Sequence, residues 1–157
     1  MKFIIDKQVI INKNRVVLHS DHSYGSSYDD TAIWHFQVSF TEWADVILNF
    51  NKSTHQCVSC EGYLSEKSKR IRNECIDIPD FVEAALIFES NEIPDYGTEI
   101  LLENQIIHFD KEKNTLAFGD VESQAEVVKF GEGQFVKLCE KRIIAIYIVF
   151  HSDDVST

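Results

Sequence analysis

The sequence has few of the residues that interrupt regular structure. It contains two prolines and six glycines in 157 residues, and it has no low-complexity tract or internal repeat. Long linkers and disordered tails are rich in such residues, so the composition argues against both. Hydrophobic residues make up 44% of the chain, which is enough for a core without disulfides or metals. We therefore expect a single domain that covers residues 1–157.

The chain also lacks a long hydrophobic run. The longest, Ile143 to Phe150, has eight residues, whereas a membrane-spanning helix needs about 20. The first seven residues contain only three consecutive apolar positions, so they do not have the pattern of a secretory signal. We expect a cytoplasmic protein that does not bind membranes. In that compartment the four cysteines are reduced thiols.

Positive charge is scarce and unevenly placed. The chain has 15 lysines and arginines against 26 acids, a net charge of −11. Two stretches contain no lysine or arginine, residues 16–51 with five acids and residues 73–110 with ten. Such a balance disfavours nucleic acids and favours a basic protein partner, because unneutralised carboxylates repel one another and attract cations. A solvated surface that happens to lack basic residues has the same composition.

No familiar catalytic motif is present. The sequence contains no P-loop, no G-x-S-x-G and no known metal-loop pattern. Gly131-Glu132-Gly133 lacks the third glycine and the following helix of a dinucleotide site, so it is typical of a turn. We therefore expect no cofactor and no enzymatic activity.

One group of soft ligands leaves a zinc site open as an alternative. Cys57 and Cys60 have the C-x-x-C spacing of half a zinc motif, and His55 and Cys75 flank them. The second half of the motif is missing, because Cys75 stands alone. Ordinary reduced thiols, buried as small hydrophobic side chains, account for the same residues.

A second alternative is a metal-binding or hydrolytic site on a polar loop. His19 and His22 flank Asp21 in a segment rich in serine and glycine. Histidines and carboxylates that lie close together bind divalent metals or perform acid–base chemistry. An exposed, solvated loop has the same composition.

Apolar and polar side chains alternate in much of the sequence, which predicts β-strands. Asn12 to Asn14, residues 110–114 and residues 131–133 have the composition of turns between strands. The eight-residue apolar run near the C-terminus is typical of a central strand buried on both faces. The predicted strands are 3–11, 15–19, 32–40, 99–109, 115–118, 125–130, 134–138 and 143–150.

Two segments have apolar side chains at helical spacing. One follows Thr41 as an N-cap, with apolar positions at Trp43, Val46, Ile47 and Phe50. The other begins at Pro79 and continues to about Phe88. Residues 62–73 fit a short exposed helix or a long loop. The predicted fold class is α+β, an antiparallel sheet of about six to eight strands with two or three helices packed on one face.

In its size and acidic character, the chain resembles the immunity proteins of bacterial toxin systems, including contact-dependent growth inhibition. The resemblance is carried by the acid-only stretches 16–51 and 73–110, and no family motif is matched. It implies that the chain binds and blocks a basic toxin domain of the nuclease type. The acids would pair with lysines and arginines, and the tyrosines would anchor the contact. The candidate partner-binding residues are Tyr28, Asp29, Asp30, Glu89, Glu92, Asp95, Tyr96 and Glu99.

Overall fold

The computed structural model describes residues 2–29, 33–41, 44–65, 71–89, 102 and 106–152, and all regular structure among these residues is β-strand. Because none of them forms a helix, none forms a helix of the length and apolar character that crossing a membrane requires. The strands are β1 Lys2–Asp6, β2 Val16–Leu18, β3 Ser23–Gly25, β4 Ile33–Thr41, β5 Ala44–Asn51, β6 Cys57–Leu64, β7 Ile71–Asn73, β8 Val82–Glu83, β9 Ala85–Glu89, β10 Ile107–Asp110, β11 Thr115–Gly119, β12 Glu126–Gly131, β13 Gln134–Cys139 and β14 Arg142–Ser152.

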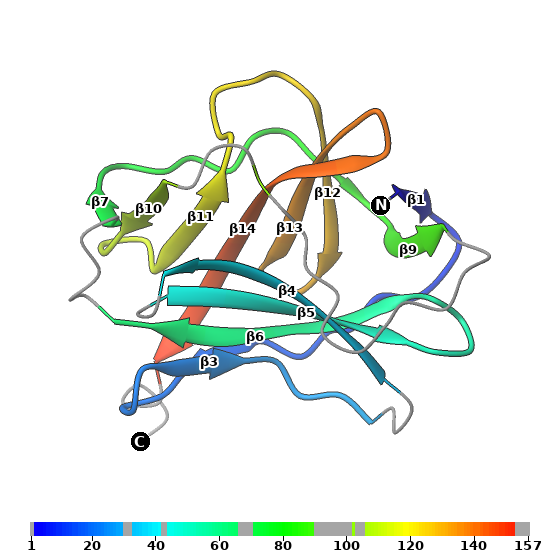
Figure 1. Cartoon of the computed structure of the whole chain (residues 1–157), viewed down its shortest axis with the longest axis horizontal. Helices are drawn as coiled ribbons and strands as arrows, with labels where there is room; N and C mark the ends of the chain where they lie inside the picture. Colours follow the sequence, from blue (N-terminus) through cyan, green and yellow to red (C-terminus); the bar gives the residue numbers. More distant parts are fainter. Residues whose placement is uncertain are drawn as a thin grey trace.

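Most of these strands belong to one curled, mixed sheet (Figure 1). Its main path runs in the order β4-β5-β6-β3-β2-β14-β11-β10-β7. β13, β12 and β8 branch from β14, and β1 pairs with β9 in a separate ribbon. Figure 1 shows β14 crossing the molecule from the β12–β13 side to the β3 side. The strand predicted at 143–150 is therefore confirmed as central.

The alternation of side chains along β14 separates two apolar clusters. Ile146, Ile148 and Phe150 point into the main core, together with Phe36 and other aromatic side chains. Residues 145, 147 and 149 point to the opposite face, where Ala145 and Tyr147 belong to a smaller cluster. Ile76 and Ile78, which lie between β7 and β8, pack on this smaller cluster. We call residues 74–78 the strap, because this segment covers the outer face of the sheet.

The helix predicted after Thr41 is wrong, because Ala44–Asn51 forms β5 and pairs with β4 and β6. Val46 and Phe50 are four residues apart and fit a helical face as well as a strand face. Leu48 decides between them, since it is fully buried beside Val46 and Phe50 at a spacing of two. Trp43 lies outside the described residues.

The helix predicted from Pro79 is also wrong. Val82–Glu83 forms β8, which pairs with β12, and Ala85–Glu89 forms β9, which pairs with β1. Both partners are distant in sequence, so the local spacing of apolar residues does not reveal them. In place of the helix or loop expected at 62–73, β6 continues to Leu64 and β7 covers Ile71–Asn73. The predicted α+β class is therefore corrected to a mixed β-sheet.

Two hairpin predictions are confirmed and one is wrong. β10 and β11 pair around residues 111–114, and β12 and β13 pair around Gly133, whose φ is +69°. A Cβ at Gly133 would lie 2.4 Å from the carbonyl oxygen of Val149, so this turn requires glycine. The strands expected at 3–11 and 15–19 do not pair with each other. β1 pairs with β9, while β2 pairs with β3 and, in parallel, with β14.

The N-terminal strand provides a direct test of the alternation. Phe3 is 1% exposed and packs among aromatic rings, 5.9 Å from Phe88 between ring centroids, whereas Ile4 is 38% exposed. We expect Phe3→Ala to lower the free energy of unfolding by about 3–5 kcal/mol, because it empties a buried aromatic site. Ile4→Ala should cost less than about 1 kcal/mol. Urea denaturation of both variants measures this, and equal losses would contradict the pairing of β1 with β9.

Candidate functional site

One hollow on the sheet is a groove of about 590 Å³ that crosses β5, β6, β3 and β2. Since Val46, Leu48 and Cys60 face the main core, their neighbours in sequence point to the opposite, outer face. We call this hollow the acidic groove. Its polar lining includes Asp45, Glu61, Tyr63, His19 and Arg15.

Hydrogen bonds within the sheet shape the groove near Asp45. The hydroxyl of Tyr24 donates to the carbonyl oxygen of Asp45 at 2.6 Å, and the backbone N–H of Tyr63 donates to the Asp45 carboxylate at 2.7 Å. Gly62 makes this arrangement possible, because a Cβ there would lie 2.6 Å from the Tyr24 hydroxyl. The Asp45 carboxylate is thereby held in one position at the edge of the groove.

The ionised form of Asp45 is disfavoured by burial and by the nearby charge of Glu61. Asp45 and Glu61 are diagonal neighbours, since Asp45 pairs with Tyr63 and Ile47 pairs with Glu61. Burial raises the pKa of Asp45, and the charge of Glu61 raises it further, against the opposing hydrogen bond from Tyr63. No lysine or arginine of the described residues forms an ion pair with either carboxylate, although Arg15 lines the groove.

One buried hydroxyl beside the groove, that of Ser26, has no hydrogen-bond partner in the described part of the chain. Ser26 is 7% exposed. A buried hydroxyl without a partner is disfavoured, so a ligand that bonds to it gains free energy. The acidic groove thus offers two carboxylates and a hydroxyl to a hydrogen-bond donor.

Tyr28 and Asp29 lie together beside a smaller hollow of about 310 Å³, which Ile10 also lines. Ile10 is 83% exposed, an unusual position for a large apolar side chain. Asn12 donates a hydrogen bond of 2.8 Å to the carbonyl oxygen of Ser27 and holds this segment in place. Two of the predicted partner-binding residues are therefore neighbours of an exposed apolar anchor.

Of the remaining predicted partner-binding residues, one is placed in an ion pair and five lie outside the described residues. Glu89 forms an ion pair of 3.0 Å with Lys141. The other five, Asp30, Glu92, Asp95, Tyr96 and Glu99, lie outside the described residues.

Several acids of the stretch 73–110 are neutralised by lysines that are distant in sequence. The distance from nitrogen to oxygen is 2.6 Å for Lys113–Asp77 and 2.8 Å for Lys13–Glu83. With the Glu89 pair, these contacts remove much of the uncompensated charge expected there. The sequence does not single out Glu61, because it lies outside the two acid-only stretches, in a segment that also contains Lys52. The alternation of residues 57–64, which predicts a strand, could have placed it on the outer face.

The residues of the possible zinc site do not gather around one point. Cys57 and Cys60 are fully buried in the main core, where burial raises the pKa of both thiols. The Nδ1 atom of His55 lies 3.2 Å from the carbonyl oxygen of Phe88, and Cys75 is exposed on the strap. In the described part of the chain, no three histidines, cysteines or acids are placed to hold a metal ion.

The His19–His22 loop is a tight turn. The Asp21 carboxylate accepts hydrogen bonds from the backbone and hydroxyl of Ser23, at 3.0 and 2.5 Å. His22 has a φ of 71° and packs its ring against Tyr63, with the centroids 6.0 Å apart. Asp21 is therefore used to shape the turn, and His19 lines the acidic groove.

A comparison with models of protein families finds none that matches this chain, and a comparison with curated proteins finds no match. The resemblance to immunity proteins rests on size and charge.

The pKa of Asp45 predicts how stability depends on pH. Since the folded-state pKa lies above the unfolded value, ionised Asp45 destabilises the fold at neutral pH, and this penalty disappears as the pH falls through the folded-state pKa. We expect Asp45→Asn to raise the melting temperature at pH 7 by about 1–3 °C, because the amide keeps the bond to Tyr63 without the charge.

Asp29→Asn is the matched control, because it removes one charge from an exposed position. Thermal unfolding at pH 7 and at about pH 3 measures both variants. A gain for Asp45→Asn that persists at the lower pH, or a loss at pH 7, would contradict the proposed repulsion in the acidic groove.

Proposed function

We propose that this chain is a cytoplasmic protein-binding module that neutralises a basic protein partner, in the manner of an immunity protein that blocks a nuclease-type toxin domain. The observation that carries the proposal is the acidic groove. Asp45 and Glu61 line it together, and no cation of the described residues pairs with them. Their repulsion is relieved when a partner supplies the missing positive charge.

Arginine or lysine side chains of a partner match the chemistry of the acidic groove. A guanidinium donates to two carboxylate oxygens at once, and such charge-assisted hydrogen bonds are about twice as strong as neutral ones. The Ser26 hydroxyl and the Tyr63 ring extend the same surface. The groove is large enough for a short basic loop, which favours a folded protein over a small ion.

The hollow beside Tyr28 and Asp29 adds an apolar contact. Interface energy is concentrated in a few aromatic or apolar anchors that a polar rim surrounds. Ile10 and Tyr28 have this character, and Asp29 lies beside them. The segments 12–15 and 27–29 line both hollows, so one partner surface contacts the acidic groove and this anchor together.

The net charge of −11 acts on the rate of association. A negative field concentrates basic proteins near the surface and raises association rates about 10–10³-fold at low salt. The same field repels nucleic acids and anionic membranes, so neither is proposed as a partner. A protein that must block a toxin before it acts benefits from fast capture.

The test uses charge reversal in the acidic groove. A basic nuclease domain encoded by a neighbouring gene would serve as the probe, with an arginine-rich model peptide in its place where no such gene exists, and stopped-flow mixing measures the association rate constant. We expect the double variant Asp45→Lys and Glu61→Lys to lower this constant by about 10–100-fold at low salt, because it reverses the local field. The wild-type rate should fall steeply as salt is added.

The control reverses two exposed acids elsewhere, Glu126→Lys and Glu140→Lys, which change the net charge by the same amount. The control should slow association by only a few-fold, and circular dichroism checks that both variants are folded. If both double variants slow association equally, or if the rate does not depend on salt, the acidic groove is not the contact site.

A further inference from the structure

A second candidate site lies on the outer face of the other half of the sheet, under the strap. His108 of β10 pairs with Ala117 of β11, and Ala117 pairs with Tyr147 of β14. These three residues form one row across the sheet, on the face opposite the main core. Ala117 between them is fully buried in the smaller cluster.

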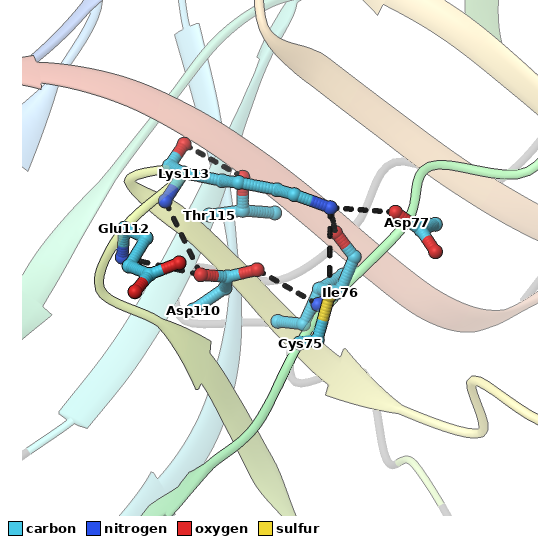
Figure 2. A network of polar contacts seen from close by, with 7 residues as sticks. All are labelled: Cys75, Ile76, Asp77, Asp110, Glu112, Lys113 and Thr115. Carbon is cyan, nitrogen blue, oxygen red and sulfur yellow. Dashed lines mark hydrogen bonds and ion pairs between the residues drawn. The ribbon is translucent and has the colours of Figure 1, made fainter.

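The strap is fixed over this row by hydrogen bonds and an ion pair (Figure 2). The Asp110 carboxylate accepts a bond of 2.9 Å from the backbone N–H of Ile76. The ammonium of Lys113 lies 2.6 Å from the Asp77 carboxylate and 3.3 Å from the Ile76 carbonyl oxygen. Figure 2 shows the Asp110 and Lys113 contacts reaching the strap from the β10–β11 hairpin, so the hairpin holds this wall in place.

A buried lysine fixes the opposite wall, which is the loop after β11. The ammonium of Lys137 donates to the carbonyl oxygens of Asp120, Val121 and Ser123 at 3.2, 3.0 and 2.7 Å. Lys137 is 2% exposed, an uncommon burial for a charged side chain. Three carbonyl oxygens in one loop replace the water that this ammonium loses.

Between the strap and the loop is a pocket of about 190 Å³, which we call the strap pocket. Three carboxylates line it, from Glu74, Asp77 and Glu122, and no lysine or arginine is among the lining residues. Two polar atoms of these lining residues, Nε2 of His108 and the hydroxyl of Tyr147, are buried and have no hydrogen-bond partner in the described part of the chain. The site therefore has carboxylates at its rim and two buried polar atoms without hydrogen bonds, Nε2 of His108 and the hydroxyl of Tyr147.

The protonation of His108 determines what the pocket accepts. Its Nδ1 atom contacts the Glu74 carboxylate, so Nδ1 carries the proton and Nε2 presents a lone pair in the neutral ring. Burial and the charge of Arg72 lower the pKa of His108, while Glu122 and the Gly119 carbonyl oppose them.

We propose that the strap pocket binds an ammonium or guanidinium group, whose N–H donors bond to Nε2 of His108 and to the oxygen of Tyr147. The Glu74 and Glu122 carboxylates supply the opposite charge, since Asp77 is already paired with Lys113. The pocket is smaller than the 300–1,000 Å³ or so that is typical of drug-sized ligands, so it matches a single head group. The proposal does not rest on the acidic groove, which lies on other strands.

The test is an NMR titration of the whole chain with methylguanidinium. We expect saturable shifts at His108, Ala117 and Tyr147, with binding complete below about 20 mM. Tetramethylammonium is the matched probe, because it has the charge without an N–H donor. Methylurea has donors without the charge. Both should bind at least about tenfold more weakly.

Two pairs of variants distinguish binding in the strap pocket from nonspecific attraction to the acidic surface. Tyr147→Phe should weaken methylguanidinium binding about five- to tenfold, whereas Tyr63→Phe in the acidic groove should leave it unchanged. Glu122→Gln should weaken it more than Glu126→Gln, which removes the same charge outside the pocket. The fold of each variant is checked by its amide spectrum.

A short peptide, acetyl-Gly-Arg-Gly-amide, distinguishes the two sources of the cation. Binding of both probes supports a site for a side chain of a protein, and binding of methylguanidinium alone supports a free small molecule. The proposal is overturned if neither probe gives saturable shifts, if tetramethylammonium binds equally well, or if Tyr147→Phe has no effect. None of these results bears on charge reversal in the acidic groove, so the two proposals fail separately.

Discussion

β14 is hydrogen-bonded along both edges, and the two halves of the sheet meet at this strand. Its earlier residues pair with β13 and β11, and residues 150–152 pair in parallel with β2. Both faces of the strand are covered, the inner one by the main core and the outer one by the smaller cluster around Tyr147. A strand in this position must be apolar on both sides, which accounts for the unbroken run from Ile143 to Phe150.

Both candidate sites are consequences of the same alternation. Residues that point into the main core leave their neighbours on the outer face, where Asp45 and Glu61 line one hollow and His108 and Tyr147 line another. The walls differ in kind. The acidic groove is open and bounded by the strands themselves, whereas the strap pocket is closed by two irregular segments that Lys113 and Lys137 hold in place.

Ion pairs with lysines neutralise some of the acids and leave others with uncompensated charge. Lys13, Lys113 and Lys141 each form an ion pair with an acid of the stretch 73–110, across at least 36 positions of sequence. Exposed pairs of this kind contribute little stability, because water and salt screen them. Their effect on recognition is larger, because they leave a smaller set of carboxylates, including Asp45 and Glu61, available to a partner.

Local signals predicted the parts of the fold that depend on neighbouring residues. The turns at 110–114 and 131–133, the strand from Ile33 and the central strand from Ile143 all follow from turn chemistry and alternation within a short window. The sequence predicts helices at β5 and at β8–β9, because Val46 and Phe50, and likewise Val82 and Leu86, are spaced as on one face of a helix. Pairing with neighbouring strands in the folded structure makes both segments extended.

The sequence by itself determined the excess of acids, the positions of tight turns and the burial of the C-terminal strand, since composition and local spacing carry that information. The tertiary structure alone decided which carboxylates keep a counter-ion and which polar atoms are buried without a partner. Glu61 lies diagonally opposite Asp45 because β5 pairs with β6, and His108 and Tyr147 share one row because β11 pairs with both β10 and the distant β14. Free energy from non-local packing selects such pairings, and no single segment encodes it.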